Sequence, residues 1–325
     1  MDCMSNYGME PDRLCVVYGD VTLGVHGIGF DYIFSYHGGG PESFVVHGKE
    51  WLYRTPKPTF WRATTDNDRG NGFPMRSGMW LGADLFIRCT GAAVSVDGKE
   101  MGTPCAPENN RYTSAETAEQ VQIIYSYETI TNPAASVEVS YTVEADGRIL
   151  TEVHYCGRKG LPELPVFGMR FIMPTAAAGY CYEGLSGETY PDRMAGGMPG
   201  ICRIEGMPVT RYLVPQDCGV HMGTKWLEVY RRTTKNNSRR DAGEFGLRFR
   251  SVGDSFAFSC LPYTAEELEN ATHHEELPPV RRTVVSLLGA VRGVGGIDSW
   301  GSDVEEAYRI DAEKDIRYSF IIERI

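Results

Sequence analysis

Alternation of apolar and polar residues is the dominant pattern along this chain. Every second residue is apolar from Val121 to Tyr127, and again from Val137 to Val143. A period of two places one apolar row on a single face of a β-strand. These two runs therefore predict a pair of antiparallel strands.

Turn residues separate these runs from further short ones. Asp97-Gly98 follows the run Ala93–Val96, and Ala145–Arg148 supplies a second Asp-Gly pair before Ile149–Tyr155. Asp-Gly is typical of tight hairpin turns. Six more runs rich in β-branched or aromatic residues predict strands: Val166–Met173, Trp226–Arg231, Phe245–Phe249, Phe256–Leu261, Thr283–Leu288 and Ile316–Ile322.

One segment, Thr264–Asn270, predicts a helix. Thr264 suits an N-cap, and Glu266 and Glu267 suit the first turn of a helix. So many strands without alternating helices exclude a TIM barrel and a doubly wound sheet. The predicted fold is all-β, with stacked antiparallel sheets and one short helix. We expect a single domain over residues 1–325, whose first fourteen residues are loosely ordered.

The amino-acid composition indicates a globular protein and excludes two classes of partner. Hydrophobic residues make up 42% and aromatic residues 11% of the 325 residues, which is enough for a packed core. The net charge of −11 would repel nucleic acid. No apolar run approaches the ~20 residues that a membrane helix requires, and no signal region is visible at the start. We therefore expect a cytoplasmic protein that binds neither nucleic acid nor membrane.

Cysteine and histidine residues give no sign of a metal site. The nine cysteines are scattered without a Cys-x-x-Cys pair, and the seven histidines are dispersed as well. This spacing argues against a zinc site and against a disulfide scaffold. No metal ligand and no cofactor are predicted in this chain.

Three segments carry unusual concentrations of turn-forming residues. Phe60–Gly70 reads Phe-Trp-Arg-Ala-Thr-Thr-Asp-Asn-Asp-Arg-Gly, which predicts a structured polar loop because Asx side chains bond nearby backbone and glycine tolerates a positive φ. By itself this segment also fits a long turn anchored in the core by its two aromatic residues. The other segments are Gly184–Arg193 and the glycine-rich Gly293–Trp300.

Together these segments resemble, in order and spacing, three motifs in the C-terminal domain (domain 5) of glycoside hydrolase family 2 β-galactosidases. The first resembles the family's aromatic-Arg-Ala-Pro-Thr-Asp-Asn-Asp signature, with Thr64 in place of proline. The second is similar to Gly-x-Gly-x-x-Glu-x-Tyr-x-Asp-Arg, with a departure at Ser186-Gly187. The third resembles Gly-x-Gly-Gly-x-Asp-Ser-Trp. The resemblance covers the chain from about Cys15 onward and implies a β-supersandwich like that of galactose mutarotase.

The resemblance implies a role within a larger enzyme. The family's two catalytic glutamates belong to a TIM-barrel domain, which takes roughly 250 residues and has no room here. The chain would then be the non-catalytic small subunit of a heteromeric β-galactosidase. It would complete the active site of a TIM-barrel large subunit, which hydrolyses terminal β-D-galactosides such as lactose and carries the family's magnesium and sodium ions. The adjacent pairs Glu266-Glu267 and Glu275-Glu276 are expected to be solvated charges.

Site residues follow from the same resemblance. Trp300 matches a tryptophan that reaches the active-site mouth, where it would stack on sugar; on composition alone it could be a core residue. Asp298 is expected to brace the Trp300 loop. Residues expected to brace a mobile loop over Asp66–Pro74 are Arg62, Asp66, Asn67 and Asp68, with Gly70 and Gly72 as hinges and Asp192 and Arg193 as a buried structural pair.

A partner is expected to cover the face near Trp61 and Trp300, and the chain alone could self-associate. Two other functions remain open at this point. A stand-alone aldose 1-epimerase would need a carboxylate base and a histidine acid, for which the candidates are His154, His221 and His273. A stand-alone carbohydrate-binding protein would also make use of an exposed tryptophan.

Overall fold

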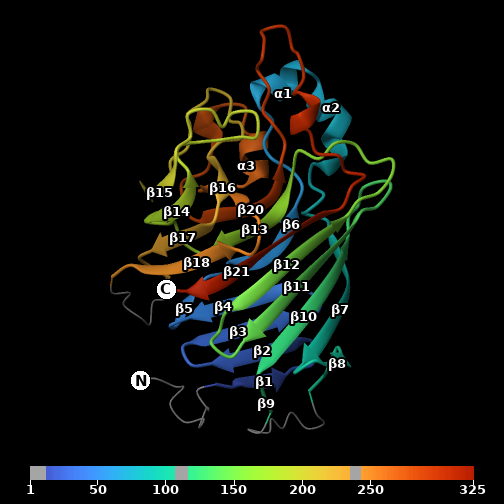
Figure 1. The fold of residues 1–325 in the computed structure, drawn as a ribbon, viewed down its shortest axis with the longest axis vertical. Coiled ribbons are helices and arrows are strands. Elements are labelled where there is room, and N and C mark those ends of the chain that lie inside the picture. The colour runs from blue at the N-terminus through green and yellow to red at the C-terminus, as the bar shows by residue number, and fades with distance from the viewer. Residues whose placement is uncertain (1–11, 107–115, 235–242) are drawn as a thin grey trace.

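All paired strands of the computed structural model run antiparallel, in three sheets (Figure 1). The structure describes residues 12–106, 116–234 and 243–325, so most of the N-terminal segment expected to be loosely ordered lies outside it. The six-stranded sheet has the order β5 (Lys49–Glu50), β4 (Gly40–Val46), β3 (Phe30–Ser35), β2 (Thr22–Gly27), β1 (Leu14–Tyr18) and β9 (Thr117–Ala118).

The other two sheets are built from the rest of the chain. The ten-stranded sheet has the order β15 (Pro199–Glu205), β14 (Gly179–Leu185), β17 (Trp226–Arg231), β18 (Phe245–Ser251), β21 (Ile316–Arg324), β12 (Ile149–Cys156), β11 (Ser136–Glu144), β10 (Gln120–Glu128), β7 (Arg88–Val96) and β8 (Lys99–Gly102). The five-stranded sheet has the order β16 (Val220–Thr224), β19 (Phe256–Leu261), β20 (Thr283–Val291), β13 (Val166–Met173) and β6 (Arg54–Thr59).

The strands predicted from alternation are confirmed. The apolar rows of β10 and β11 face the core, and the two strands pair with Ile123 opposite Tyr141. The β7–β8 turn places Asp97 and Gly98 at φ angles of 50° and 77°, as a tight hairpin turn requires. The predicted all-β fold of antiparallel sheets is therefore confirmed.

The ten-stranded sheet packs against both smaller sheets. Tyr141 of β11 meets Phe34 of β3, with ring centroids 5.9 Å apart, and Phe249 of β18 meets Phe171 of β13 at 5.3 Å. Buried residues from all three sheets meet in one large apolar cluster, and two smaller clusters lie beside it. The two smaller sheets thus share the core face of the large sheet.

The prediction of a single helix is wrong, because the described residues already include three short α-helices. They are α1 (Asp66–Gly70), α2 (Phe73–Ser77) and α3 (Ala265–Asn270), accompanied by the 3₁₀ turns η1 (Gly78–Trp80), η3 (His274–Glu276) and η4 (Glu306–Tyr308). Helix α3 begins where predicted, with Thr264 as N-cap. Helix α1 lies where a polar loop was expected, since Thr65 and Asp68 form a capping box that starts a helix.

Across the described ranges, no helix is both long and apolar enough to span a membrane.

Candidate functional site

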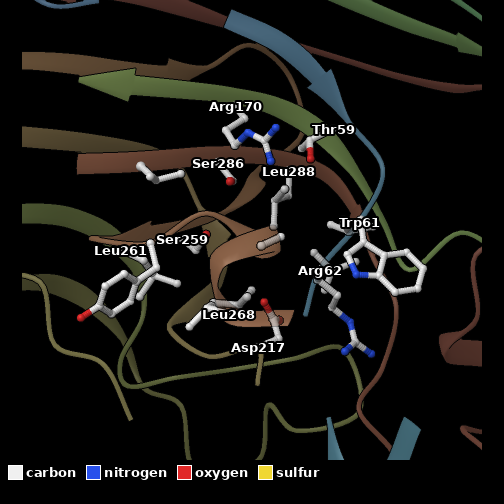
Figure 2. Close-up of a pocket in the computed structure, with 16 residues that line it drawn as sticks. Thr59, Trp61, Arg62, Arg170, Asp217, Ser259, Leu261, Leu268, Ser286 and Leu288 are labelled. Atoms are coloured by element: carbon white, nitrogen blue, oxygen red, sulfur yellow. The ribbon is translucent and has the colours of Figure 1, made fainter. Parts of the chain in front are cut away.

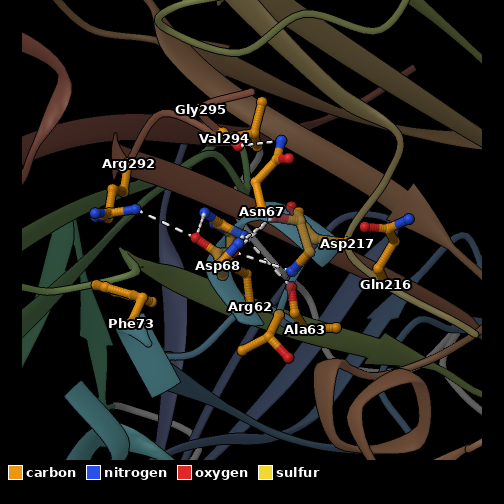
Figure 3. A network of polar contacts seen from close by, with 12 residues as sticks. Arg62, Ala63, Asn67, Asp68, Phe73, Gln216, Asp217, Arg292, Val294 and Gly295 are labelled. Atoms are coloured by element: carbon orange, nitrogen blue, oxygen red, sulfur yellow. Dashed lines mark hydrogen bonds and ion pairs between the residues drawn. The ribbon is translucent and has the colours of Figure 1, made fainter. Parts of the chain in front are cut away.

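The candidate site is organised around Asp68, whose carboxylate joins two motifs far apart in the sequence (Figure 3). Arg62 Nη1 donates to Asp68 Oδ2 at 2.7 Å, and Arg292 Nη1 donates to Asp68 Oδ1 at 3.2 Å. All three side chains are buried. A buried carboxylate flanked by two guanidinium groups is well compensated, whereas removal of one partner would leave an unpaired buried charge.

Helix α1 holds Asp68 in place through its N-terminal cap. Thr65 Oγ1 accepts a hydrogen bond from Asp68 N at 3.2 Å, and Asp68 Oδ2 accepts one from Thr65 N at 2.9 Å. Just before this cap, Glu269 of α3 accepts hydrogen bonds from Thr64 N at 2.6 Å and Trp61 Nε1 at 3.3 Å. The segment Phe60–Gly70 is therefore fixed both at its aromatic residues and at its acidic residues.

Arg292 extends the network toward α2. It donates to Asp303 Oδ1 at 2.6 Å and to Glu163 Oε2 at 3.2 Å, and its guanidinium lies 4.0 Å from the ring centroid of Phe73. Cation–π stacking suits a desolvated arginine. Sequence reasoning missed Arg292, Asp303 and Glu163; the position of Arg292 directly before the glycine run was the only available signal.

The glycine-rich segment is held by the other two motifs. The Asp192 carboxylate accepts hydrogen bonds from Val294 N at 3.0 Å and Gly295 N at 2.7 Å, and Arg193 donates to Gly295 O. Asn67 Nδ2 donates to Val294 O at 2.9 Å. The structure thus brings the three motifs together. Asp192 and Arg193 were expected to be a buried structural pair. Their side chains do form an ion pair at 4.0 Å, but only Asp192 is buried, since the Arg193 side chain is 42% exposed.

Glycine is required at Gly296 in this loop. Its φ is 78°, which L side chains rarely adopt, and a Cβ atom there would lie 2.7 Å from Asn67 Nδ2. The close approach lets the loop rest directly on α1. The chain beyond Gly296 continues outward in the loop between β20 and η4, which projects in orange-red at the top of Figure 1.

Trp300 is presented to solvent on this loop. The residue is 92% exposed, so the core alternative for it is wrong. Asp298 Oδ1 accepts hydrogen bonds from Trp300 N at 2.9 Å and Ser302 N at 3.2 Å. A further hydrogen bond from the Ser302 hydroxyl, together with these backbone bonds, lowers the pKa of Asp298. An ordered turn therefore carries an uncovered indole ring.

Comparison with known proteins places the chain in a family. The β-galactosidase small chain family matches residues 26–322. The chain belongs to that family. It is 63% identical to the β-galactosidase small subunit of Latilactobacillus sakei, over 95% of this chain and 98% of that protein. It is 33% identical to a β-galactosidase of Halalkalibacterium halodurans over 96% of this chain, but spans only 28% of that protein's length.

Solved structures with a similar fold have much lower sequence identity to this chain. A galactose mutarotase-like protein from Lactobacillus casei aligns over 96% of this chain and 100% of its own, with 8% identity and a TM-score of 0.44. Galactose 1-epimerase from Lactobacillus acidophilus aligns over 96% and 98%, with 8% identity and a TM-score of 0.39. These likenesses concern the fold alone.

Two expectations about the first motif are corrected by the structure. Gly70 is the last residue of α1 with an ordinary helical backbone, so a positive-φ hinge at this position is wrong. Gly72, between α1 and α2, has a φ of 76°. Trp61 is only 3% exposed, so its own ring contributes little to the face near it that a partner was expected to cover. Asp66, by contrast, points its carboxylate to solvent and pairs with Arg69 at 3.1 Å.

Asp217 is a buried acid that the sequence did not single out. It accepts a hydrogen bond from the Tyr190 hydroxyl at 2.8 Å, and burial, opposed by the nearby Arg62, raises its pKa to about 6. Figure 2 shows Asp217 and Arg62 at a cavity of about 30 Å³. This volume holds one or two water molecules and excludes a sugar. A lone aspartate in a loop gives no sequence signal.

The adjacent glutamates noted in the sequence mostly have structural partners. Glu266 lies 3.3 Å from the Arg170 guanidinium, and Glu267 accepts a hydrogen bond from Thr264 N at 2.8 Å. Glu276 accepts one from Thr272 N at 2.7 Å, and bonds with Thr272 lower the pKa of its carboxyl. A glycosidase acid needs a raised pKa, so Glu276 is poorly suited to that task.

The three candidate histidines have different environments. His221 is buried against Phe258, and burial lowers its pKa to about 4. His273 is exposed near Glu276. His154 Nε2 lies 2.8 Å from Asp315 Oδ2. His154 also borders an open groove of about 560 Å³ on the ten-stranded sheet, whose polar lining includes Gln122, Glu138, Glu152 and Arg317.

Within the described parts of the chain, no group of three or more His, Cys, Asp or Glu side chains is arranged to hold a metal ion.

Proposed function

We propose that this chain is the non-catalytic small subunit of a heteromeric β-galactosidase. A large subunit with a TIM barrel supplies the catalytic carboxylates, and the two chains hydrolyse terminal β-D-galactosides such as lactose. The observation that carries the proposal is Trp300, an almost fully exposed tryptophan on an ordered loop whose base is held by the three motifs that resemble the family. The 63% identical small subunit of Latilactobacillus sakei supports it.

Trp300 has a positioning role in this proposal. The apolar C–H face of a galactoside lies on the indole ring and gains about 1 to 2 kcal/mol from dispersion and apolar burial. Asp298 fixes the loop before substrate arrives, so little ordering entropy is lost on binding. The Asp68 network keeps the base of the loop rigid, because each of its buried charges has a partner.

Within the segment Asp66–Pro74, the part that follows α1 is proposed to move over the bound substrate, with Gly72 as its hinge, while Asp68 stays in its buried network. Asn71 before Gly72 and Arg76 in α2 both donate hydrogen bonds to Asp303, at 3.2 Å and 2.5 Å. Such surface contacts are individually weak, so they can break and reform during turnover. The magnesium and sodium ions of the family are proposed to lie in the large subunit, and the complex in the cytoplasm.

Reconstitution tests the proposal. The chain alone should not hydrolyse a chromogenic galactoside, whereas addition of the purified large subunit should give activity that saturates at a fixed ratio of the two chains. The large subunit alone serves as the control. Turnover by the lone small chain, proportional to its concentration after removal of contaminants, would contradict the proposal.

A stand-alone carbohydrate-binding or aldose 1-epimerase-like activity is the second candidate. The groove beside His154 favours it, because it combines carboxylates, an imidazole and an arginine in an open volume of about 560 Å³. Polarimetry of fresh α-D-galactose with the lone chain distinguishes the two functions. Faster mutarotation that His154→Asn abolishes would support this candidate.

A further inference from the structure

A run of exposed apolar residues begins in α2 and continues beyond it. Between residues 75 and 86 the outward-facing apolar side chains are Met75, Met79, Leu81, Leu85 and Phe86, which we call the apolar ridge. Met75 is 90% and Phe86 64% exposed. Single exposed apolar residues are ordinary, but a cluster of large ones in one segment marks an interaction surface.

The apolar ridge is continuous with the candidate site. At its start, Arg76 binds Asp303, and Asp303 also binds the buried Arg292 of the Asp68 network. Gly301, next to Trp300, lies against the end of α1, since a Cβ atom there would be 3.2 Å from Gly70 O. A partner that reaches Trp300 would therefore have the ridge beside it.

At its other end the ridge borders a basic pocket. Leu85 lines a pocket of about 180 Å³ together with Arg54, Arg281 and Arg282, which we call the arginine pocket. None of these three arginines forms an ion pair with the described residues. Arg282 is held with its guanidinium 3.5 Å from the ring centroid of Tyr53, and Arg54 at 5.6 Å from the same ring.

Arginines outnumber carboxylates in the lining of the arginine pocket, where Arg170 joins the three arginines named above. The carboxylates in its lining are Glu266, which pairs with Arg170, and Glu267, which caps α3. Three like charges held together repel one another, and this is unusual in a chain whose net charge is −11. A carboxylate from another molecule would relieve that repulsion, and the arginine fork matches carboxylate geometry.

We propose that the apolar ridge and the arginine pocket together form the docking surface for the large subunit. The ridge is buried in an apolar patch of that subunit, and one of its carboxylates enters the pocket. This inference rests on the proposed function. A large subunit is favoured over a small anion because the pocket adjoins large exposed apolar side chains, and aromatic and arginine residues dominate binding at protein interfaces.

Matched single substitutions test the docking surface. Arg281→Glu and Phe86→Ser change exposed residues of the pocket and the ridge; Arg54→Glu is a second pocket variant. Lys99→Glu on β8 and Ile201→Ser on β15 make the same kinds of change at exposed positions elsewhere. Calorimetry with the purified large subunit, at low and high salt, measures each dissociation constant, and melting temperatures confirm that each variant is folded.

We expect Arg281→Glu and Phe86→Ser to weaken binding roughly tenfold or more, with both controls unchanged. The loss for Arg281→Glu should shrink at high salt and that for Phe86→Ser should not. If all variants bind as the unmodified chain does, the docking surface is wrong while the proposed function stands. If the unmodified chain does not bind the large subunit, the proposed function fails.

The same variants also test two other ligands for this surface, a small anion and a second copy of the chain. If Arg281→Glu abolishes binding of inorganic phosphate but leaves the two-chain complex intact, the pocket is a small-anion site and the inference is overturned. If Phe86→Ser reduces only self-association of the small chain, the ridge is an interface between copies of this chain. That result would also overturn it.

Discussion

At the scale of single residues, a substitution of Trp300 should weaken substrate binding and leave folding unchanged. Because its ring is 92% exposed, Trp300→Ala should change the free energy of unfolding by less than about 0.5 kcal/mol. Loss of a stacking contact of about 1 to 2 kcal/mol should raise KM of the reconstituted enzyme roughly 5- to 30-fold. Melting temperature and steady-state kinetics check both parts; a large fall in melting temperature with unchanged KM would show that the residue is structural.

Asp217 makes stability depend on pH. Its folded-state pKa of about 6 lies above its ordinary value of 3.8, so the folded chain retains a proton that the unfolded chain releases. Asp217 therefore contributes up to about 3 kcal/mol to the free energy of unfolding. This contribution is complete below pH 3.8 and is lost as pH rises through 6. Asp217→Asn, which cannot ionise, should gain stability relative to the unmodified chain by up to that amount between pH 4 and pH 7.

Urea unfolding of the unmodified chain and of Asp217→Asn at each pH measures this difference in the free energy of unfolding. The buried His221, whose pKa is lowered to about 4, acts in the opposite direction: its contribution is present above 6.5 and is lost as pH falls toward 4. Its effect is common to both proteins and cancels in the comparison. A stability difference that stays constant from pH 4 to pH 7 would show that Asp217 does not titrate in this range.

At the scale of elements, two neighbouring glycines should respond in opposite ways. Gly70 is helical and open, since an added Cβ meets no atom within 4 Å, so Gly70→Ala should be neutral or stabilise by up to about 1 kcal/mol. Gly72 has a φ of 76°, so Gly72→Ala should destabilise by about 1 to 2 kcal/mol and alter turnover if the segment moves. Chemical denaturation of the pair tests this; equal losses would contradict it.

Strands were easier to predict than the site because alternation reports burial directly. Val121, Ile123 and Tyr125 each lie in the core, as their period of two indicates. Helix α1 has five residues, which is too short for a helical period to show, so only its cap at Thr65 and Asp68 carried the signal. The partners of Asp68 could not be found, because Arg292 lies 224 positions away and spacing says nothing about such distant contacts.

At the scale of the whole molecule, the exposed ridge should make the lone chain associate with itself. Large uncovered apolar side chains favour self-association when the proper partner is absent. Sedimentation should show oligomers of the lone chain that disappear when the large subunit is added, and Phe86→Ser should reduce them. A lone chain that is monomeric at every accessible concentration would contradict this expectation.

The place of β21 in the ten-stranded sheet affects how the protein can be made. This strand lies between β18 and β12, yet it follows every other strand of that sheet in the chain. During synthesis, β12 and β18 therefore leave the ribosome with open edges that β21 has not yet joined, and open edges recruit other chains. The two halves of the large sheet can join only after β21 has emerged. Until then the chain is an intermediate with exposed strand edges, which is prone to aggregate and which a chaperone could shield.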